Sequence, residues 1–545
     1  MLIINIIIFS LLILAWLLPN HYLPWLSAYQ ELCMFLVALL FIFLLILKNK
    51  IYVPKIAYGI FLIFLIPIIQ FFLGIIHNLG DALLTSMYIG FFLIALIGGY
   101  SISKLKHKNR TKILNFFLIS FLFSSIVSVG LQFNQWLLLD GNIWIVDLAP
   151  NARPFANVAQ PNLLSTLLII GLFSVFYFYE NNKINKFSAS LAAIFVLFGI
   201  ALNFSRTAWV FCIVFIIFYL FKKRTIKDEF YLKTLSVFIW SGVFLIYLLL
   251  IPYLSEKLGL LYEVDLNRRV TSGMERLNMW SQVLDIIQQQ PFLGYGWNQL
   301  NIAQMSVENI NLNHPIFGYS HNFVLDLLIW NGVLIGVILV GIMGYFYINL
   351  SIKIDQKNDL ILLAIIGIII LHSMLEYPFA YSYFLIPLAF LTGLVYGNYY
   401  CNHITLKKSK ILSSILNIAL TSVLLLTAYE YLKIDPEYQA MRYENVQLKD
   451  REPGQEEQQY LMLTSINDYI WFVRYPLQSG MSDFELQRAK QVAFKKPGKA
   501  VLIHYAKLLI LNNRVDEAQF VINKYNAFYH SKLKISDLKF DITHN

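Results

Sequence analysis

The sequence predicts an all-α protein that crosses a membrane many times. Of its 545 residues, 58% are hydrophobic and only 14% are charged, whereas about a quarter of a soluble chain is charged. The hydrophobic residues come in blocks of about 17–25, the length of a helix that crosses a hydrocarbon core of ~30 Å. The alternating pattern of a membrane β-strand is absent from the sequence. We therefore expect a polytopic helical membrane protein with about 13 transmembrane helices.

The expected spans follow one another through most of the chain. The first block, residues 2–18, is as short and apolar as the core of a signal peptide, but no basic segment precedes it and no small-residue cleavage site follows it. We interpret it as the first span. The other spans are expected at residues 30–47, 56–76, 83–102, 113–137, 161–179, 188–204, 207–221, 232–252, 322–348, 360–376, 383–400 and 411–432.

The positive charges indicate how the spans are oriented. The net charge is +10, and Lys and Arg concentrate in the connections after every second span. The alternate connections carry almost none, apart from Arg153 and Arg206. This asymmetry is the positive-inside rule; it places the N-terminus in the cytoplasm and the C-terminus outside, and it explains the basic charge without a nucleic acid. The Lys-rich connections are residues 48–50, 104–112, 181–186, 222–227, 351–357 and 406–410.

Spans and connections divide the chain into five parts. Residues 1–137 are N-terminal transmembrane helices, and residues 138–252 are a central transmembrane region that includes an outer loop. Residues 253–321 form a large outer loop. Residues 322–432 hold the C-terminal transmembrane helices, and residues 433–545 are a polar outer tail. Each boundary falls where a polar segment meets an apolar block.

The large outer loop contains an amphipathic helix. Met279, Val283, Ile286 and Ile287 recur at spacings that share one helix face, and Pro291 ends the pattern. A loop of this length is usually functional or disordered, and its aromatic residues favour order. We expect the helix to lie on or near the membrane surface.

The tail is helical from about Asp483 onward. Residues 485–494 and 500–525 form amphipathic patterns around a Pro-Gly turn, and the second pattern contains a hairpin signal. The arrangement resembles one tetratricopeptide-type (TPR-like) unit. A single repeat cannot bury its own face, so the tail is either a packing cap or a platform for a protein substrate.

A polar, amide-rich segment precedes the span that begins near residue 161. It contains Arg153, Asn157, Gln160 and Asn162. Amides at this place can cap the following helix, a purpose that Asn162 or Pro161 could serve alone, and this requires no ligand. Arg153 is harder to explain, because the outer connections otherwise carry almost no positive charge. A cation kept on this side indicates an anionic ligand.

Further arginines are expected on the same side. Arg206 lies between two apolar runs, where an arginine can extend its head to the interface or bind phosphate oxygens through its guanidinium fork. In the large loop, Arg268 and Arg269 have acidic neighbours and are expected on a solvated face. Arg276 precedes the Trp280 face of the loop helix and is the better candidate for an anion.

One histidine stands where the large loop meets a span. In the segment GYSHNFVLDLLIWNG, residues 318–332, Ser320 can cap the helix, and His321 is then expected in its first turn. The helix dipole disfavours a charged ring there, which keeps the imidazole able to accept a proton. Taken alone, His321 is better explained as an interfacial residue. Asn322 is a further polar group at the same helix start.

The segment LEYPFAYSYF follows a later span on the same side. Glu376 and His372 are four residues apart, and we expect them on one helix face at the end of that span. Tyr377, Tyr381 and Tyr383 fit an aromatic belt at the membrane interface. A belt does not explain the glutamate.

These groups converge on one membrane face. The topology places Gln160, Arg206, His321 and Tyr377 at the outer lipid–water boundary. Arginines and one neutral histidine there fit a lipid-linked diphosphate, which the arginines would hold while the histidine takes a proton from an incoming hydroxyl. The sequence has no metal-ligand spacing and no glycine-rich phosphate loop, so we expect neither a metal nor a cofactor.

The same residues resemble the Wzy/O-antigen-ligase superfamily of bacterial membrane enzymes. The segment ERLNMWSQVLDIIQQQPFLGYGWNQ followed by SHNFVLDLLIWNG looks like its core signature. The run RPFANVAQPNLLSTLL looks like a narrower branch, the protein O-oligosaccharyltransferases of the PglL type. LEYPFAYSYF and the helical tail fit that branch as well. The resemblance covers most of the chain from about residue 140 onward.

The resemblance implies en bloc transfer of an oligosaccharide from undecaprenyl diphosphate to a serine or threonine of a periplasmic protein such as a pilin. The enzyme would lie in the bacterial inner membrane, with its active site and C-terminus in the periplasm. By matching motif, His321 is the essential histidine, Gln160 the functional glutamine and Tyr377 the tyrosine of the site. Arg206 matches the arginine near the diphosphate, and Arg276 is a weaker match.

The implied partners are the lipid-linked donor, the acceptor protein and membrane lipid. An O-antigen ligase with lipid A core as acceptor, and a polymerase of repeat units, remain open. A transporter or flippase would predict internal repeats and ionisable residues near mid-membrane, and neither is evident. The remaining polar residues expected beside the donor are Arg153, Asn157, Asn322 and Glu376.

Overall fold

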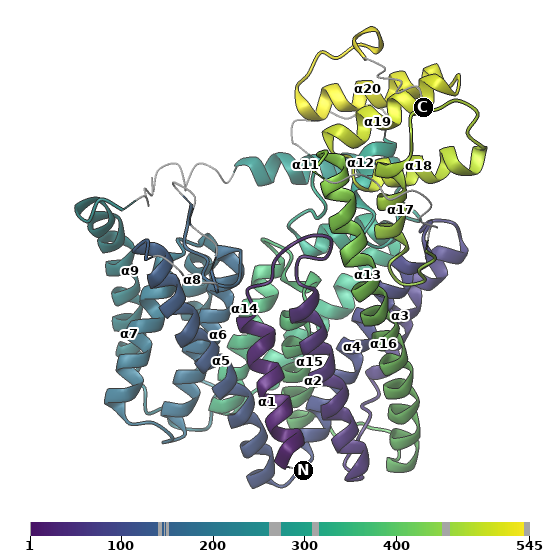
Figure 1. The fold of residues 1–545 in the computed structure, drawn as a ribbon. Coiled ribbons are helices and arrows are strands. Elements are labelled where there is room, and N and C mark those ends of the chain that lie inside the picture. The colour runs from purple at the N-terminus through teal and green to yellow at the C-terminus, as the bar shows by residue number, and fades with distance from the viewer. Residues whose placement is uncertain are drawn as a thin grey trace. The chain divides into compact units, whose positions relative to one another are not determined.

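The structure is a computed structural model of the chain. It describes residues 2–139, 144, 145, 148, 152–260, 274–307, 316–448 and 458–538. Within these residues every regular element is a helix, and extended backbone pairs only in an isolated bridge between Pro54 and His403 (Figure 1). The predicted all-α class is confirmed.

A helix occupies each range that was predicted as a span. By length and hydropathy, seven helices of the described chain can each cross a membrane, namely α2, α4, α5, α6, α9, α13 and α16. The chain is thus a multi-pass membrane protein, and the number of crossings stays a prediction. The helices over the predicted spans are α1 (Leu2–Leu17), α2 (Ala28–Leu47), α3 (Ala57–Phe72), α4 (Leu79–Ser103), α5 (His107–Trp136), α6 (Pro161–Glu180), α7 (Lys186–Leu202), α8 (Arg206–Lys222), α9 (Thr234–Lys257), α13 (Phe323–Lys353), α14 (Lys357–Ser373), α15 (Ser382–Tyr399) and α16 (Leu406–Asn445).

The chain divides into two compact units. Both units are assembled from several separate segments, because α3, α4, α13 and α16 each contribute to both. Unit 1 comprises residues 1–61, 88–268 and 345–422, and unit 2 comprises residues 62–87, 269–344 and 423–545.

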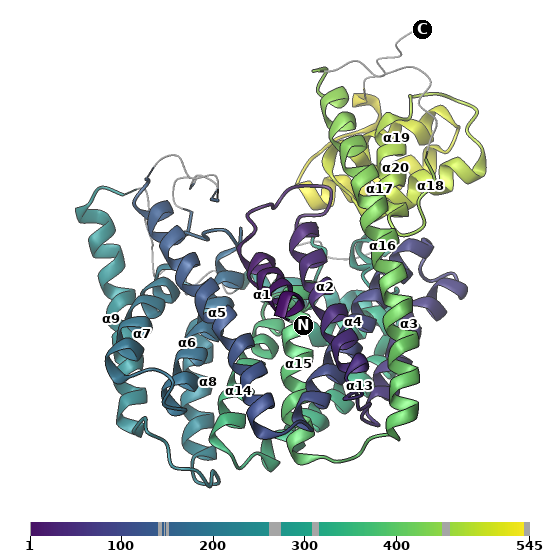
Figure 2. The ribbon, with the colours of Figure 1, turned by 60° about the horizontal axis from the view of Figure 1, so that its bottom comes forward.

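In unit 1, α6 is a central helix. It packs against α5, α7 and α14, and α7 packs against α9; Figure 2 shows α5, α6, α7 and α9 side by side. Small residues allow the close approach: a Cβ added at Gly171 would lie 2.2 Å from Oγ of Ser125, and one at Gly199 would lie 2.5 Å from Val129. Helices in membranes pack through such small residues.

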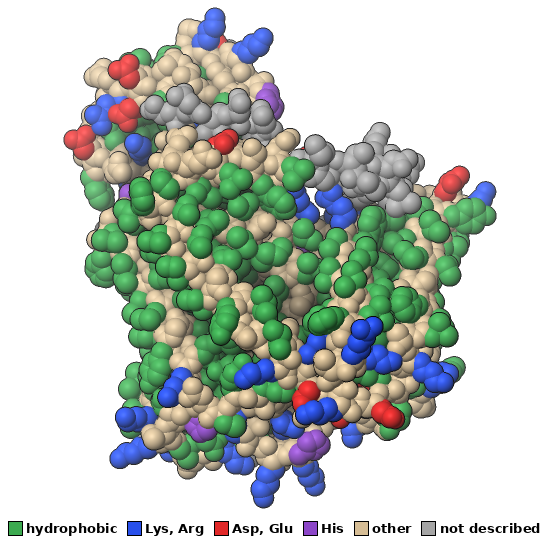
Figure 3. Space-filling model, turned by 180° about the vertical axis from the view of Figure 1, so that it is seen from behind, with side chains coloured by type: hydrophobic (Ala, Val, Ile, Leu, Met, Phe, Trp, Pro, Cys, Tyr) green, Lys and Arg blue, Asp and Glu red, His purple; other side chains and the backbone are tan. Residues whose placement is uncertain are grey.

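One face of the molecule shows a broad hydrophobic area with basic side chains, those of Lys and Arg, along one edge of it (Figure 3). Hydrophobic side chains that point outward from the spans, such as Ile217 at 64% exposure and Leu249 at 69%, suit contact with lipid rather than water.

In unit 2, α13 is interrupted at Gly332, where φ is 75° and ψ is 166°. The break frees the carbonyls of Ile329 and Trp330. These accept hydrogen bonds from the backbone N–H groups of Tyr295 at 2.8 Å and Gly296 at 3.1 Å. Irregular backbone in a span must find its partners inside the protein, and the GYG turn of the large loop supplies them.

Gln70 completes this junction from α3. Its Nε2 donates to the carbonyl of Trp330 at 2.9 Å, and its Oε1 accepts the N–H of Trp297 at 3.0 Å. One buried amide therefore bridges the broken helix and the loop that fills the break. The local pattern does not predict this interruption, because WNG stands inside an otherwise continuous apolar block.

The loop helix is α11 (Met274–Gln289), and its predicted face is buried. Met279, Val283, Ile286 and Ile287 are all inaccessible to solvent or nearly so. The helix belongs to unit 2. The position of the helix at a membrane surface stays a prediction.

The tail folds around one hydrophobic core. Its helices are α17 (Thr464–Arg474), α18 (Asp483–Lys495), α19 (Lys499–Leu511) and α20 (Val515–Tyr529), and the predicted hairpin is present as α19 and α20. Their shared core includes Met305 of the short loop helix α12 (Leu300–Ser306). The tail thus buries its face against the large loop as well as against itself.

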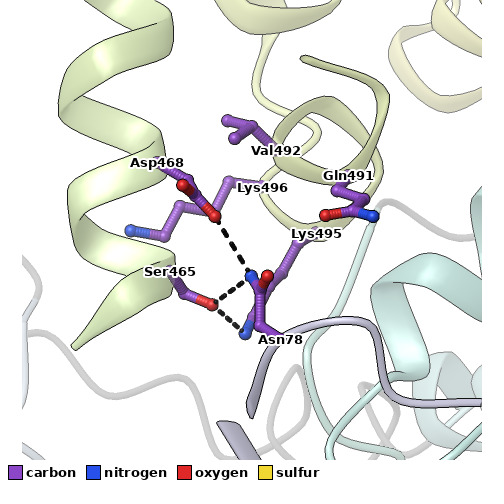
Figure 4. A pocket seen from close by; sticks show the side chains of 7 residues that line it. All are labelled: Asn78, Ser465, Asp468, Gln491, Val492, Lys495 and Lys496. Atoms are coloured by element: carbon purple, nitrogen blue, oxygen red, sulfur yellow. Dashed lines mark hydrogen bonds between the residues drawn. The ribbon is translucent and has the colours of Figure 1, made fainter. Parts of the chain in front are cut away.

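Polar contacts join the tail to the connection before α4. Nδ2 of Asn78 donates to Oγ of Ser465 at 3.1 Å and to Oδ2 of Asp468 at 3.3 Å, and Nζ of Lys495 donates to Oγ of Ser465 at 2.7 Å (Figure 4). Lys495 also forms an ion pair with Asp81. Unit 2 is therefore held together across α4, the tail and the large loop.

Candidate active site

The predicted site residues fall in both units. Arg276, His321 and Asn322 belong to unit 2. The other six belong to unit 1: Arg153, Asn157, Gln160, Arg206, Glu376 and Tyr377.

His321 lies in a left-handed turn just before α13. Its φ is +56°, a conformation uncommon for residues other than glycine. Oδ1 of Asn322 accepts the N–H groups of Val324 at 3.0 Å and Leu325 at 3.4 Å, so Asn322 is the N-cap. The predictions that Ser320 caps the helix and that His321 lies in its first turn are wrong.

Ser320 instead fixes the backbone on the other side of His321. Its N–H donates to Oδ1 of Asp326 at 2.9 Å, and its carbonyl accepts Nε1 of Trp280 at 3.0 Å. Its Oγ accepts the N–H of Asn322 at 3.1 Å and donates to the carbonyl of Asn322 at 2.8 Å. Ser320 and Asp326 are fully buried. The backbone is therefore fixed by hydrogen bonds of Ser320 before His321 and of Asn322 after it, while the ring of His321 is half-buried.

Two charged residues accompany this turn. Asp326 lies near enough to His321 for the two to interact electrostatically. Arg276 is half-buried on α11, four residues before Trp280, and residues four apart share a helix face. The helix that binds the Ser320 carbonyl therefore also carries the arginine. Arg268 and Arg269 lie outside the described residues.

In unit 1, Arg153 enters a chain of side-chain hydrogen bonds. Its Nη1 donates to Oδ1 of Asn162 at 3.3 Å and to the carbonyl of Asn203 at 3.2 Å. Nδ2 of Asn162 donates to Oε1 of Glu376 at 3.0 Å. The predicted residues Arg153 and Glu376 are thus joined through one asparagine at the start of α6.

Arg206 is the first residue of α8 and follows Asn203 in the turn after α7. It is half-buried. Since Arg153 binds the carbonyl of Asn203, the structure brings the 153–162 loop to the turn that carries Arg206. Two predicted cations therefore belong to one polar end of unit 1.

Gln160 is the N-cap of α6. Its Oε1 accepts the N–H of Leu163 at 2.6 Å, which is the capping role that the sequence left open for this loop. Ala156 and Ala159 just before it have φ of 50° and 61°, so the loop is held in strained backbone conformations. In the described part of the chain, no hydrogen bond is formed by Nε2 of Gln160, and a contact of this amide with a ligand stays a prediction.

Asn157 holds the same loop from inside. It is 2% exposed, its Nδ2 donates to the carbonyl of Trp16 at 2.6 Å, and its Oδ1 accepts the hydroxyl of Ser128 at 2.8 Å. His21 also lies 3.0 Å from its carbonyl oxygen. These bonds favour a supporting role, and a contact of Asn157 with the donor stays a prediction.

Glu376 and Tyr377 lie in the turn between α14 and the 3-10 helix η1 (Pro378–Ala380). The expectation that Glu376 and His372 share a helix face is wrong, because α14 ends at Ser373. His372 is instead fully buried and lies with Nδ1 2.8 Å from Oγ1 of Thr166. That contact fixes α14 on α6, while Glu376 turns toward Asn162.

Tyr377 belongs to a row of aromatic rings. It stacks on Tyr381 with 6.2 Å between ring centroids, and Tyr381 stacks on Tyr383 at 5.2 Å. Burial, and after it the charge of Glu376, raises the pKa of Tyr377. The phenol therefore keeps its proton at neutral pH and can donate a hydrogen bond.

Two glutamines of α5 were missed by the sequence reasoning. Oε1 of Gln135 accepts the N–H groups of Phe155 at 2.7 Å and Ala156 at 3.0 Å, and Nε2 of Gln132 donates to Oδ1 of Asn203 at 2.8 Å. Their role could have been suspected from the sequence, because two glutamines about one helical turn apart are unusual inside an apolar span. The described residues contain no cluster of His, Cys, Asp or Glu that could hold a metal ion.

The chain matches known families and proteins over most of its length. Residues 191–341 match the family model described as O-antigen ligase, and residues 360–537 match that described as the C-terminal part of a virulence factor membrane-bound polymerase. A general O-oligosaccharyltransferase of Acinetobacter baylyi is 30% identical over 544 residues, which cover 97% of this chain and 93% of that protein. A ComP-specific O-oligosaccharyltransferase of the same organism is 30% identical over 350 residues, 64% of this chain and 62% of that protein.

These matches include the motifs on which the site was predicted. The RPFANVAQPN loop, the His321 turn and the LEYPFAYSYF segment all lie within the region similar to the general O-oligosaccharyltransferase, since that region covers 97% of the chain. The suspected family is confirmed. The chain belongs to the O-oligosaccharyltransferases of the Wzy/O-antigen-ligase superfamily, which are membrane-bound glycosyltransferases.

Proposed function

We propose that the chain transfers a preassembled oligosaccharide from undecaprenyl diphosphate to a serine or threonine hydroxyl of a periplasmic protein, such as a pilin. The reaction class follows from the family. The observation that carries the assignment of the site is the turn before α13, where buried hydrogen bonds hold His321 at φ +56°. A non-glycine residue kept in such a conformation by its surroundings is typical of a functional site.

In this reaction the acceptor hydroxyl attacks C1 of the first sugar. The imidazole of His321 takes the hydroxyl proton or orients the hydroxyl, while the new bond forms between the acceptor oxygen and C1. The bond from C1 to the diphosphate oxygen breaks, and undecaprenyl diphosphate leaves with the electron pair. Gln160 through its Nε2 and Tyr377 through its phenol orient donor and acceptor.

The arginines bind the diphosphate of the donor. Arg206 and Arg153 offer guanidinium forks, which suit phosphate oxygens bidentately, and Arg276 adds a third cation. Glu376 supports this set through Asn162, which binds Arg153 as well. Asn322 fixes the His321 turn, and Asn157 fixes the loop that carries Arg153.

The protein lies in the bacterial inner membrane with about 13 spans. The basic edge of the surface in Figure 3 supports the cytoplasmic placement of the Lys-rich connections. The parts 138–252, 253–321 and 433–545 then present their loops and tail to the periplasm. The TPR-like tail is a platform for the acceptor or a packing cap, and its shared core with α12 ties it to the loop that ends at His321.

Reconstitution tests the proposal directly. The full chain in lipid nanodiscs is given a labelled undecaprenyl-diphosphate glycan and an acceptor protein, and glycan on the acceptor is measured. His321→Ala is expected to lower the rate at least ~100-fold, whereas His107→Ala, an exposed histidine at the start of α5, leaves it unchanged. Normal transfer by the His321 variant would refute the assignment.

The same assay separates the related reactions. Label on lipid A core rather than protein indicates a ligase, and longer lipid-linked glycan indicates a polymerase. Movement of the donor across the bilayer without any new glycosidic bond indicates a transporter. Each of these results would replace the proposed acceptor or reaction.

A further inference from the structure

A cavity of about 520 Å³ opens among four helices of unit 1, apart from the predicted site residues. Such a volume is typical of small-molecule sites, which span ~300–1,000 Å³. Its walls come from α6, α7, α8 and α9 and are mainly apolar. Aromatic and aliphatic side chains line it, among them Phe173, Phe176, Leu197, Phe211, Phe215 and Phe244.

Room for an occupant comes from small residues on the facing helices. Ala189 and Ala193 of α7 line the cavity, and α8 approaches α9 across it where Sγ of Cys212 lies 3.6 Å from Oγ of Ser241. The mainly apolar lining is thus suited to hydrocarbon.

The cavity has cations at one end. Lys186 starts α7 and Lys233 is the N-cap residue of α9; both line the cavity and are exposed. Within the described part of the chain, neither ammonium has an ion pair or hydrogen bond. At the opposite end the lining residues Ile200 and Ala208 are apolar.

A carboxylate near this mouth, that of Glu180, is already bound. Oε1 and Oε2 of Glu180 accept the N–H groups of Leu232 at 2.8 Å and Tyr231 at 3.0 Å. Nζ of Lys357 lies 3.3 Å from the same carboxylate and 4.8 Å from the ring of Tyr231. Glu180 therefore shapes the mouth, and Lys357 neutralises it, so the charges of Lys186 and Lys233 remain for an anion.

We infer that this cavity binds an anionic phospholipid, with its acyl chain between α8 and α9 and its phosphate at Lys186 and Lys233. Lysines at a membrane surface attract anionic lipid headgroups, and the apolar walls suit the chain. The headgroup stands at the end of α6 opposite to Asn162, about 30 Å away for a helix of this length. The isoprenoid chain of the donor, held at Arg206, is the competing occupant and would enter from the other end.

Trp240 lines the cavity and provides the probe. The full chain is placed in nanodiscs that contain either brominated phosphatidylglycerol in phosphatidylcholine, or brominated phosphatidylcholine in phosphatidylglycerol, at equal bromine content. The fluorescence of Trp240 is obtained as the difference between the parent protein and Trp240→Phe. Quenching of Trp240 is expected to be stronger in the first mixture.

Lys186→Gln/Lys233→Gln is expected to reduce the preference for phosphatidylglycerol about tenfold. The control Lys48→Gln/Lys108→Gln, which changes exposed lysines of other basic connections, leaves it unchanged. Ala193→Phe fills the cavity and removes the quenching in both mixtures. If Ala193→Phe does not fold, as judged by circular dichroism, the double lysine variant alone tests the inference.

Equal quenching by the two brominated lipids, or no effect of the double lysine variant, overturns the inference. Either result would show that the cavity contacts bulk lipid without selecting an anionic headgroup. Relief of quenching by unlabelled undecaprenyl phosphate, but not by unlabelled phosphatidylglycerol, also overturns it and assigns the cavity to an isoprenoid chain. None of these outcomes depends on the transfer reaction.

Discussion

The side-chain amide of Asn162 donates a hydrogen bond of 3.0 Å to Oε1 of Glu376, although 214 residues separate the two in sequence. The same amide accepts Nη1 of Arg153 at 3.3 Å. One asparagine at the start of α6 thus links a cation from the loop before α6 to a carboxylate beyond α14. The link explains why a glutamate accompanies the aromatic row of Tyr377, which a membrane belt alone does not require.

Replacement of Glu376 tests this link. Glu376→Ala leaves the half-buried amide of Asn162 without its charged acceptor, a loss of about 1.5–3 kcal/mol, and we expect transfer efficiency to fall roughly 10- to 100-fold. Glu376→Gln keeps an oxygen for Asn162 and is expected within about threefold of the parent. The measurement is kcat/KM for the lipid-linked donor, with Glu256→Gln, an exposed glutamate of α9, as control. An equal loss in the Gln and Ala variants would show that the charge matters rather than the hydrogen bond.

Asn322 is expected to act as a cap that positions His321. Asn322→Ala removes the acceptor of the Val324 and Leu325 N–H groups and costs about 1 kcal/mol of helix stability. We expect transfer to fall about tenfold as the turn loosens, while Asn322→Asp, which still caps, recovers most of it. Thermal unfolding and kcat are measured together, with Asn349→Ala on the same helix as control.

The Asp variant decides between two roles of Asn322. If Asn322 bound the donor diphosphate, the added negative charge would make Asn322→Asp worse than Asn322→Ala. Recovery by Asp is therefore compatible only with capping.

The break in α13 depends on two glycines. A Cβ at Gly332 would lie 2.1 Å from the carbonyl oxygen of Phe292, and one at Gly294 would lie 2.4 Å from the N atom of Gly332. Both residues also have positive φ. Gly332→Ala and Gly294→Ala are each expected to destabilise the protein by more than ~3 kcal/mol, seen as a large fall in thermal midpoint and in the folded fraction on size exclusion. Gly341→Ala on the same helix has open space around it, and an equally large effect there would contradict this explanation.

Much of the fold could be predicted because apolar blocks determine where membrane helices form. The helix predicted over residues 161–179 is observed as α6 at Pro161–Glu180, since Pro161 and the capping Gln160 fix its start locally. The break at Gly332 could not be predicted. It is stabilised by Tyr295, Gly296 and Gln70, which lie far from it in sequence, and the local pattern is that of a continuous span.

The start of the helix after His321 could not be predicted from the local sequence either. Ser320 and Asn322 are both good caps, so the local sequence leaves two registers for the start of the helix. The structure selects Asn322 because Ser320 is bound by Asp326 and Trp280. The sequence identified the histidine and its helix, but the tertiary contacts determine how the ring is presented.

Lys496 makes the stability of the tail depend on pH. Burial, and after it the charge of Lys495, lowers the pKa of Lys496 to about 8, while Asp81 acts in the opposite direction. The unfolded chain has the ordinary lysine pKa of ~10.4, so between these values it binds more protons than the folded tail. Stability of the tail should therefore rise as the pH increases from about 8 toward ~10, and below pH 8 the full penalty of the buried charge remains.

Lys496→Met removes the penalty and with it the pH dependence. We expect the variant to be more stable than the parent at pH 7 and to show no added stability at higher pH from this residue, whereas Lys532→Met, an exposed lysine of the tail, keeps the dependence of the parent. Unfolding of the full chain in nanodiscs by urea is measured through the fluorescence of Trp471. This fluorescence is the difference between each protein and the same protein with Trp471→Phe. A Lys496→Met protein that is less stable at pH 7 would show that the contact of Nζ with the Tyr469 ring, at 4.4 Å, outweighs the desolvation of the charge.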